Sequence, residues 1–245
     1  MEFRVVGCGD AFGSGGRLNT CFHVTGQSTR FLLDCGATSM VGLHRENIDR
    51  PAIDLVLITH LHADHAGGLP FLVLDAQFFA KRTRPLTVAG PPGLASWYPQ
   101  AMELAFPGSS RTRQQFPLTL VELVADETWR FADLTVRPSP VAHGEAIAPA
   151  YGYRIELDGR VLAYTGDTEW TETLVPLGRD ADLLVAECYW FAKDVPWHLS
   201  WATLARHLPR IAPRQTLLTH MSTDMLAHLA DVSCETAHDG LLLEI

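Results

Sequence analysis

The chain has 245 residues, of which 47% are hydrophobic and 19% charged, a composition typical of a globular protein with a full core. Its formal net charge of -9 offers no general electrostatic attraction for nucleic acid. No apolar run reaches the roughly 20 residues that a membrane span needs.

Three short apolar runs, at residues 3–6, 21–24 and 31–34, predict strands in the first part of the chain. The glycine-rich loop at 7–16 leads into a strand rather than a helix, so a dinucleotide-binding fingerprint does not fit. Asp34, at a strand end, is expected either to support a metal ligand or to cap a turn or helix. A short helix is expected over 36–47.

Four side chains of the kinds that bind metals follow the next predicted strand, an apolar run at 55–59: His60, His62, Asp64 and His65. A glycine pair and a predicted helix follow, so the four lie on a turn at a strand end, where open α/β sheets place their sites. Imidazole and carboxylate groups together form a zinc-type ligand set. A curling loop could send His60 and His62 to one metal and Asp64 and His65 to another. The alternative is a solvated polar turn.

The middle of the chain predicts a helix at 70–80, a strand at 86–89 and a helix from the Gly-Pro-Pro-Gly segment to about residue 106. The basic turn at 81–84 is interpreted as solvated, with a phosphate-binding turn as the weaker alternative. Strands at 118–124, 129–131 and 134–138 are expected to form a second, antiparallel run.

Potential ligands follow several later strands. His143 comes after the strand at 134–138, and Asp167 follows a hairpin of 151–156 and 160–164 around an Asp-Gly turn. A further strand is expected at 183–187, and His220 follows the strand at 216–219. His198 precedes a helix at 201–211, for which Ser200 is a fitting N-cap. A helix near 225–229 and a strand at 241–245 complete a chain that we interpret as one domain, 1–245.

The cysteines point to a reducing compartment. They are odd in number, scattered and without CxxC spacing, and we interpret them as reduced, mostly buried thiols. Cys188 as a metal ligand is the minor alternative. Because the opening MEFRVVGCGD also lacks the features of a secretory signal, a cytoplasmic protein is expected.

Several of these motifs together resemble those of a known family. THLHADH matches the HxHxDH signature of the metallo-β-lactamase superfamily, and the later HG, TGDT and LTHMS segments match its remaining ligand motifs in order. The opening GCGDAFGSGGRLNTCF, LLDCGA and the closing DGLLLEI are similar to its framework, so the resemblance covers nearly the whole chain. It implies an α/β fold (α+β by some schemes), a four-layer αββα sandwich.

The resemblance also implies a set of ligands for each of two zinc ions. One ion would be held by His60, His62 and His143, and the second by Asp64, His65 and His220. Asp167 would bridge the two. Mixed nitrogen and oxygen ligands also accept manganese or iron.

Within the superfamily, the chain is most similar to the ribonuclease Z and small phosphodiesterase branch. GLPFL after the metal motif, PAYGYRIE after His143 and the HLS segment at His198 carry this similarity. Ribonuclease Z enzymes also have a long tRNA-clamping arm, but here a single hairpin separates Tyr153 from Asp167. The expected substrate is therefore a small phosphodiester (a nucleotide, a cyclic phosphate or an RNA 3′ end). Transfer RNA is not expected unless a partner subunit or another loop supplies the clamp.

The implied mechanism is hydrolysis by a hydroxide that bridges the two metals, because metal binding lowers the pKa of water from about 15.7 toward roughly 7. Asp64 would bind metal and accept a hydrogen bond from that hydroxide. His198 would protonate the leaving alkoxide or stabilise the phosphoryl oxygens. Lactone, thioester or β-lactam hydrolysis on the same site is the alternative. A diiron oxidoreductase is disfavoured because those proteins have Glu at the position of His62.

Aromatic side chains raise one open question. Trp97, Tyr98, Trp190 and Trp197 are expected at a rim, where they could line a pocket or the contact of a homodimer. We favour the pocket for Trp190 and Trp197, which bracket the loop into His198.

Overall fold

The computed structural model describes residues 1–144 and 148–245. Among these, one seven-stranded sheet consists of β1 (Glu2–Gly7), β2 (Cys21–Thr25), β3 (Arg30–Leu33), β4 (Leu55–Leu57), β5 (Leu86–Gly90), β6 (Leu118–Glu122) and β14 (Leu242–Glu244). Their order is β14-β1-β2-β3-β4-β5-β6. The pairs from β3 to β6 are parallel, and the others are antiparallel.

The second sheet of the described chain also has seven strands: β7 (Trp129–Phe131), β8 (Leu134–Val141), β9 (Ala150–Leu157), β10 (Arg160–Tyr164), β11 (Leu183–Glu187), β12 (Thr216–Thr219) and β13 (Glu235–Thr236). They follow one another in space as β13-β12-β11-β10-β9-β8-β7. The strands from β10 to β13 are parallel, whereas β7 to β10 form an antiparallel meander.

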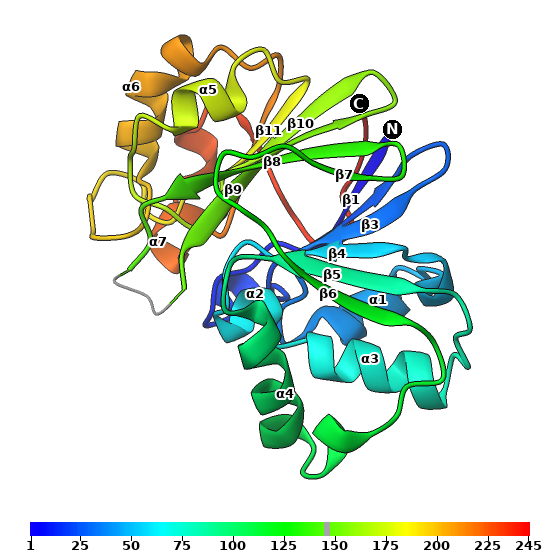
Figure 1. Cartoon of the computed structure of the whole chain (residues 1–245). Coiled ribbons are helices and arrows are strands. Elements are labelled where there is room, and N and C mark those ends of the chain that lie inside the picture. Colours follow the sequence, from blue (N-terminus) through cyan, green and yellow to red (C-terminus); the bar gives the residue numbers. More distant parts are fainter. Residues whose placement is uncertain (145–147) are drawn as a thin grey trace.

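The helices cover the outer faces of the two sheets (Figure 1). Those over the first sheet are α1 (Ser39–Arg45), α3 (Leu69–Phe78) and α4 (Leu94–Ala105), and those over the second are α5 (Leu174–Gly178), α6 (Trp201–Ile211) and α7 (Thr223–Leu226). Short segments are α2 (Ala63–Ala66) and the 3-10 turns η1 (Ser14–Gly16), η2 (Arg50–Ala52), η3 (Ser109–Arg111) and η4 (Leu229–Asp231). No described helix combines the length and apolar character that crossing a membrane requires.

The side chains of each strand point alternately to the two faces of its sheet, and the buried ones form three hydrophobic clusters. In β3, Phe31 and Leu33 face the second sheet, while Leu32 faces the helices. Successive side chains of a strand point to opposite faces, so a strand buried on both faces is apolar throughout. A separate cluster joins the second sheet to α5 and α6. The expected four-layer αββα sandwich is therefore confirmed.

One strand lies in a different sheet from the one expected. Residues 118–124 were expected to belong to the second, antiparallel run, but β6 pairs in parallel with β5, from Leu86 opposite Leu118 to Gly90 opposite Glu122. Helix α4 makes the crossover between them, and the chain passes to the second sheet only afterwards. A short edge strand carries too little pattern to reveal its partner.

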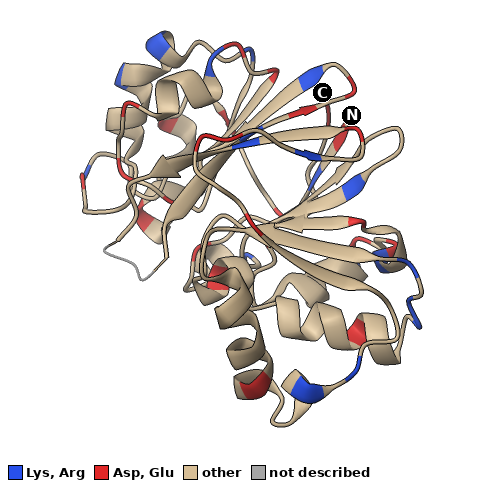
Figure 2. Ribbon diagram, in the orientation of Figure 1, with Lys and Arg blue, Asp and Glu red and all other residues tan. Residues whose placement is uncertain are grey.

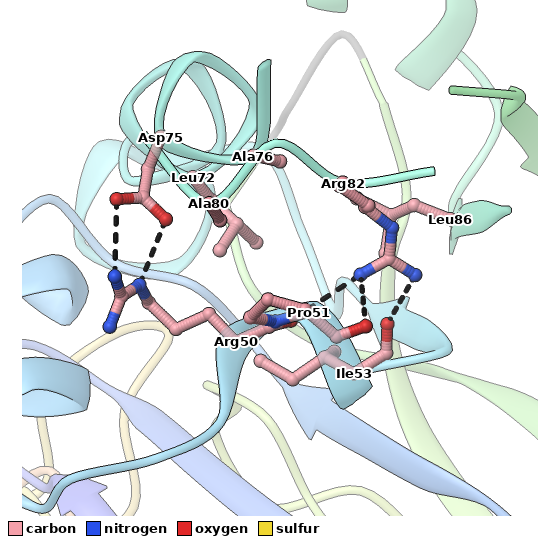
Figure 3. Close-up of a pocket in the computed structure, with 9 residues that line it drawn as sticks. All are labelled: Arg50, Pro51, Ile53, Leu72, Asp75, Ala76, Ala80, Arg82 and Leu86. Carbon is pink, nitrogen blue, oxygen red and sulfur yellow. Dashed lines mark hydrogen bonds and ion pairs between the residues drawn. The ribbon is translucent and has the colours of Figure 1, made fainter. Parts of the chain in front are cut away.

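The basic turn at 81–84 is not simply solvated, because Arg82 is only 4% exposed. Its guanidinium donates to the carbonyls of Arg84 (2.7 Å), Arg50 (3.3 Å), Pro51 (3.0 Å), Ile53 (2.7 Å) and Pro85. Figure 3 shows Arg82 pointing at Pro51 and Ile53, beside an Arg50–Asp75 ion pair. Arg82 therefore ties η2 to the turn before β5.

We expect Arg82→Met to lower the free energy of unfolding by about 3 kcal/mol, because it leaves several buried carbonyls without donors at a cost of roughly 1–3 kcal/mol each. For a chain of this size, the midpoint of thermal unfolding should fall by roughly 6–12 °C. Circular dichroism measures this midpoint. Arg84→Met is the matched control, because its ion pair with Asp54 is solvent-exposed and contributes about 0–1 kcal/mol. Equal midpoints for the two variants would contradict this role of Arg82.

Candidate metal centre

Four loops that follow strands meet at one edge of the two sheets. The loop after β4 contains His60, His62, Asp64 and His65, and the loops after β8, β10 and β12 contain His143, Asp167 and His220. The carboxyl ends of β4, β10 and β12 point the same way within their parallel arrays, so their loops converge. Residues far apart in the sequence therefore form two compact groups.

The first group consists of His60, His62 and His143, whose ligand-type nitrogens all lie within 4.8 Å of one another. His62 Nδ1 is 3.1 Å from His60 Nε2 and 3.1 Å from His143 Nε2. Burial lowers the pKa of His60 well below its ordinary value and also lowers that of His143. Both imidazoles are therefore neutral, the form of histidine that binds metals.

The second group consists of Asp64, His65, Asp167 and His220, whose ligand-type atoms also lie within 4.8 Å of one another. His65 Nε2 is 3.2 Å from Asp167 Oδ1, and His220 Nε2 is 3.2 Å from Asp167 Oδ2. Asp64 Oδ2 lies 3.4 Å from His65 Nε2. Burial alone would raise the pKa of Asp167, but His220 and His65 outweigh it and hold that pKa well below the usual range. Asp167 is thus an anion.

Asp167 also connects the two groups, because its Oδ2 lies 4.0 Å from His143 Nε2. Two buried atoms in the second group, His65 Nε2 and Asp167 Oδ1, lie 3.2 Å apart but do not form a hydrogen bond with each other or with any other described residue. An unsatisfied buried polar atom costs about 1–3 kcal/mol. A divalent cation would satisfy both atoms, and imidazole and carboxylate are its usual ligands. The donor set therefore fits a metal.

Asp34 holds His65 in place. Its Oδ2 accepts a 2.7 Å hydrogen bond from His65 Nδ1 and another from the Tyr164 hydroxyl at 3.0 Å, while Oδ1 accepts from the Thr59 backbone at 2.8 Å. A buried carboxylate of this kind fixes the ring orientation and directs Nε2 toward a metal. Of the two expectations for Asp34, support of a ligand-type residue is the one confirmed.

Two other imidazoles are oriented in the same way. His143 Nδ1 lies 3.0 Å from the carbonyl oxygen of Trp197 and His60 Nδ1 lies 3.1 Å from the Thr59 hydroxyl. Because a carbonyl oxygen can only accept, His143 carries its proton on Nδ1, and the lone pair of Nε2 faces His62. The rings are thus prepared as ligands.

His198 lies beside the second group, because its ligand-type nitrogen and those atoms of Glu187, Asp167 and His220 all lie within 4.8 Å of one another. It is paired with Glu187, a carboxylate that the sequence did not single out. Its Nδ1 donates to Glu187, the fully buried last residue of β11. Glu187 also accepts from the backbone N–H of Thr168 (2.7 Å) and of Leu199 (3.3 Å). Burial acts against the charged imidazolium, but Glu187 outweighs it and raises the pKa of His198 to about 9. His198 therefore carries a proton at neutral pH.

The position of His198 follows from the predicted helix start. Ser200 is the N-cap of α6, and its Oγ accepts from the backbone N–H of Thr203 at 3.1 Å, as expected. The helix thereby fixes the segment that precedes it.

One indication in the sequence that Glu187 could be functional is its position as a polar residue at a strand end, like Asp167.

The two groups and His198 border a hollow of about 360 Å³, here called the central hollow. Six of the candidate residues line it: His62, Asp64, His143, Asp167, His198 and His220. Phe12 and Trp197 also line it, and they are 85% and 48% exposed. An aromatic rim beside buried charged groups is suited to binding a small ligand.

Two other candidates lie elsewhere. Trp190, which we expected at the pocket with Trp197, is not among the residues that line the central hollow, and its ring lies 5.2 Å from the Lys193 ammonium. Cys188 is buried with its Sγ 3.8 Å from Met225 Sδ and belongs to neither group.

The hairpin prediction is confirmed, because β9 and β10 pair directly between Tyr153 and Asp167.

Comparison with known families gives one family match over most of the chain. The model described as "Beta-lactamase superfamily domain" matches residues 29–221. A ribonuclease Z of Mycobacterium bovis is 28% identical over 196 residues, which cover 76% of this chain and 69% of the relative.

A ribonuclease Z of Bacillus cereus is 26% identical over an alignment of 282 residues, which covers 91% of this chain and 89% of the relative. The alignment is longer than the 245 residues of this chain, so the relative has stretches that this chain lacks. The crystal structure of the short form of human tRNase Z superposes with a TM-score of 0.82 at 22% identity, covering 100% of this chain and 99% of that one. This likeness shows a shared fold.

Proposed function

The chain belongs to the family of the beta-lactamase superfamily domain and is a metal-dependent hydrolase, and we propose that it is a dinuclear zinc phosphodiesterase. The observation that carries the proposal is the convergence of two groups of ligand-type residues at the central hollow, where Asp167 of the second group also lies 4.0 Å from His143 Nε2 of the first and His198 lies alongside. The ribonuclease Z relatives, whose name denotes cleavage of a phosphodiester, give it further support.

We assign the ligands as the two groups stand. His60, His62 and His143 would hold one zinc ion, Asp64, His65 and His220 the second, and Asp167 both. The chemistry that two bound divalent metals supply is a nucleophilic water at neutral pH and a clamp on the phosphoryl oxygens. Manganese or iron could occupy the same donors.

The chain's own residues would then direct the reaction. Asp64, beside His65 Nε2 at 3.4 Å, would accept a hydrogen bond from the attacking water and so orient it. His198, protonated through Glu187, would deliver its proton to the leaving alkoxide. Asp167, an anion held between His65 and His220, would fix the spacing of the two groups.

The substrate that fits this site is a small diester. The net charge of -9 offers no general electrostatic attraction for a folded RNA, and the Lys and Arg positions that can be seen in Figure 2 are scattered along the ribbon. Only one hairpin lies between Tyr153 and Asp167, where a tRNA-clamping arm would be expected. We therefore propose a nucleotide, a cyclic phosphate or a short RNA end, rather than a whole transfer RNA.

We expect purified protein with about two zinc ions per chain to hydrolyse bis(p-nitrophenyl) phosphate, because a dinuclear site stabilises displacement at phosphorus. Treatment with a chelator should abolish release of p-nitrophenolate, and added zinc should restore it. Absorbance at a fixed pH measures the rate, and elemental analysis measures the metal.

A lactone, a thioester and a β-lactam are assayed alongside as controls. No turnover of the diester by protein that holds both metals, together with hydrolysis of one of these three, would replace the phosphodiesterase with the alternative hydrolase. Turnover unaffected by the chelator would refute the metal dependence.

A further inference from the structure

A second hollow opens beside the first His group and plays no part in the mechanism above. It measures about 550 Å³ and lies between helix α4 and the loop after β4. Gly93, Ser96, Trp97 and Gln100 line it from one side, and Leu61 and Ala148 from the other. We call it the α4 hollow. His62 and His143 line both the α4 hollow and the central hollow, so the two adjoin.

Helix α4 forms a fixed wall of this hollow. Positions 93, 96, 97 and 100 are three or four residues apart and therefore lie on one face of the helix. Glu122 Oε1 accepts from the backbone N–H of Gly93 (2.9 Å) and Ala95 (3.0 Å), which anchors the start of the helix to β6. Trp97 is partly buried and packs against the outer core of the first sheet, so its ring is supported from behind.

The wall opposite Gly93 is close. Gly93 has a φ of 99°, and a Cβ placed there would meet the Ala148 Cβ at 3.4 Å and the Leu61 Cδ1 at 3.8 Å. A side chain at position 93 would be strained by this left-handed φ, and its Cβ would lie in contact with the opposite wall. The α4 hollow is therefore narrow at Gly93.

The charge of the lining indicates what the hollow can accept. Among the described residues that line the α4 hollow, none is Lys, Arg, Asp or Glu. A second phosphate would find no Lys or Arg in the α4 hollow, whereas an uncharged group would lose little on leaving water. The volume is that of an ordinary small-ligand pocket. A planar apolar ring stacked on Trp97 matches this uncharged lining, in which Trp97 offers an aromatic face.

We propose that the α4 hollow binds one planar, uncharged aromatic arm of the diester, such as a nucleobase or an aryl ring, and that Trp97 is its principal contact. This proposal rests on the proposed function and names the substrate class of that same site. The occupant is an arm covalently attached to the phosphoryl group because the hollow adjoins the central one at His62 and His143.

The arrangement also determines which arm is retained. His198 lines the central hollow but is absent from the lining of the α4 hollow. The bond that breaks is the P–O bond to the arm near His198, and a P–O bond to the water oxygen forms in its place. One proton of that water ends on the departing oxygen and the other passes to solvent. The planar arm therefore leaves as its monophosphate ester.

The test compares two diesters that share a leaving group, phenyl p-nitrophenyl phosphate and methyl p-nitrophenyl phosphate, with zinc-loaded protein. We expect kcat/KM to be roughly 10- to 100-fold higher for the phenyl diester, the scale of one aromatic stacking contact. Trp97→Ala should bring the ratio close to one, mainly through KM, and Trp97→Phe should restore part of it. Leu104→Ala, at an 88% exposed position of α4 outside the hollow, should leave the ratio unchanged.

A binding measurement separates this proposal from the proposed function. Calorimetry with phenylphosphonate and methylphosphonate should show tighter binding of the phenyl compound, lost in Trp97→Ala. Turnover of both diesters at a ratio near one, or equal affinity for both phosphonates, overturns the role of the α4 hollow. A phenyl preference in binding without turnover of either diester supports the hollow and overturns the phosphodiesterase instead.

Discussion

Replacing His198 by alanine is expected to lower turnover of bis(p-nitrophenyl) phosphate by about 10²–10⁴-fold while both metals remain bound, because the departing aryl oxide loses its proton donor and the phosphoryl oxygens lose a neighbouring cation. His198 belongs to neither the His60–His62–His143 group nor the group around Asp64 and His65. Glu187 keeps two backbone donors, Thr168 and Leu199, in the variant, so the pocket should stay folded. Steady-state rates and elemental analysis on the same sample measure the two quantities.

His44→Ala, an exposed histidine on α1, is the control for His198→Ala and should behave like the wild type. Glu187→Gln tests the positioning carboxylate. Removing that negative charge stabilises the imidazolium less, so the pKa of His198 falls from its raised value and the high-pH limb of the rate profile moves to lower pH. Unchanged turnover in His198→Ala would end its role as general acid. An unmoved limb in Glu187→Gln would leave Glu187 only a packing role.

The second large effect is expected for Asp167→Asn. The side chain keeps its shape but loses the charge that lies 3.2 Å from His65 Nε2 and His220 Nε2 of the second group and 4.0 Å from His143 Nε2 of the first. Metal content should fall from about two ions per chain to one or fewer, and turnover should fall on the order of 10³-fold. Elemental analysis after dialysis and the diester assay give the two results.

Asp180→Asn makes the same chemical change at an exposed position and is the matched control. Asp180 has a φ of 54°, a left-handed conformation that asparagine tolerates well, so this variant should match the wild type. Thermal unfolding of both metal-free variants shows whether each folds. If Asp167→Asn kept two ions and wild-type turnover, Asp167 would not be the shared ligand.

Much of this architecture was predictable because ligand-type residues stand directly after strands that the apolar pattern reveals. The run at 55–59 predicted β4, and the Asp-Gly turn predicted the β9–β10 hairpin that precedes Asp167. Strand ends in a sheet share an edge, so a polar residue there is informative even when its partner is unknown. The sequence pattern placed His198 before a helix start, but its catalytic role was inferred only through the family resemblance.

Other features depend on contacts that no local pattern encodes. In the sequence, Glu187 is only the polar last residue of an apolar strand. Its partner His198 lies eleven positions later, and the contact between them exists only in the folded chain. Arg82 lies in a run of cations that looks solvated, yet it is buried among the carbonyls of η2. Which of the two sheets β6 joins depends on where helix α4 packs, and this packing is a tertiary property.

The site draws its residues from both sheets, and this has a consequence for how the molecule assembles. His60, His62, Asp64 and His65 follow a strand of the first sheet, whereas His143, Asp167 and His220 follow strands of the second. Neither half of the chain carries a complete donor set. On the assigned ligands, a refolding chain can form strands before it can retain an ion, so metal uptake reports the docking of the two halves. With these ligands, a bound ion would act as a crosslink that resists their separation.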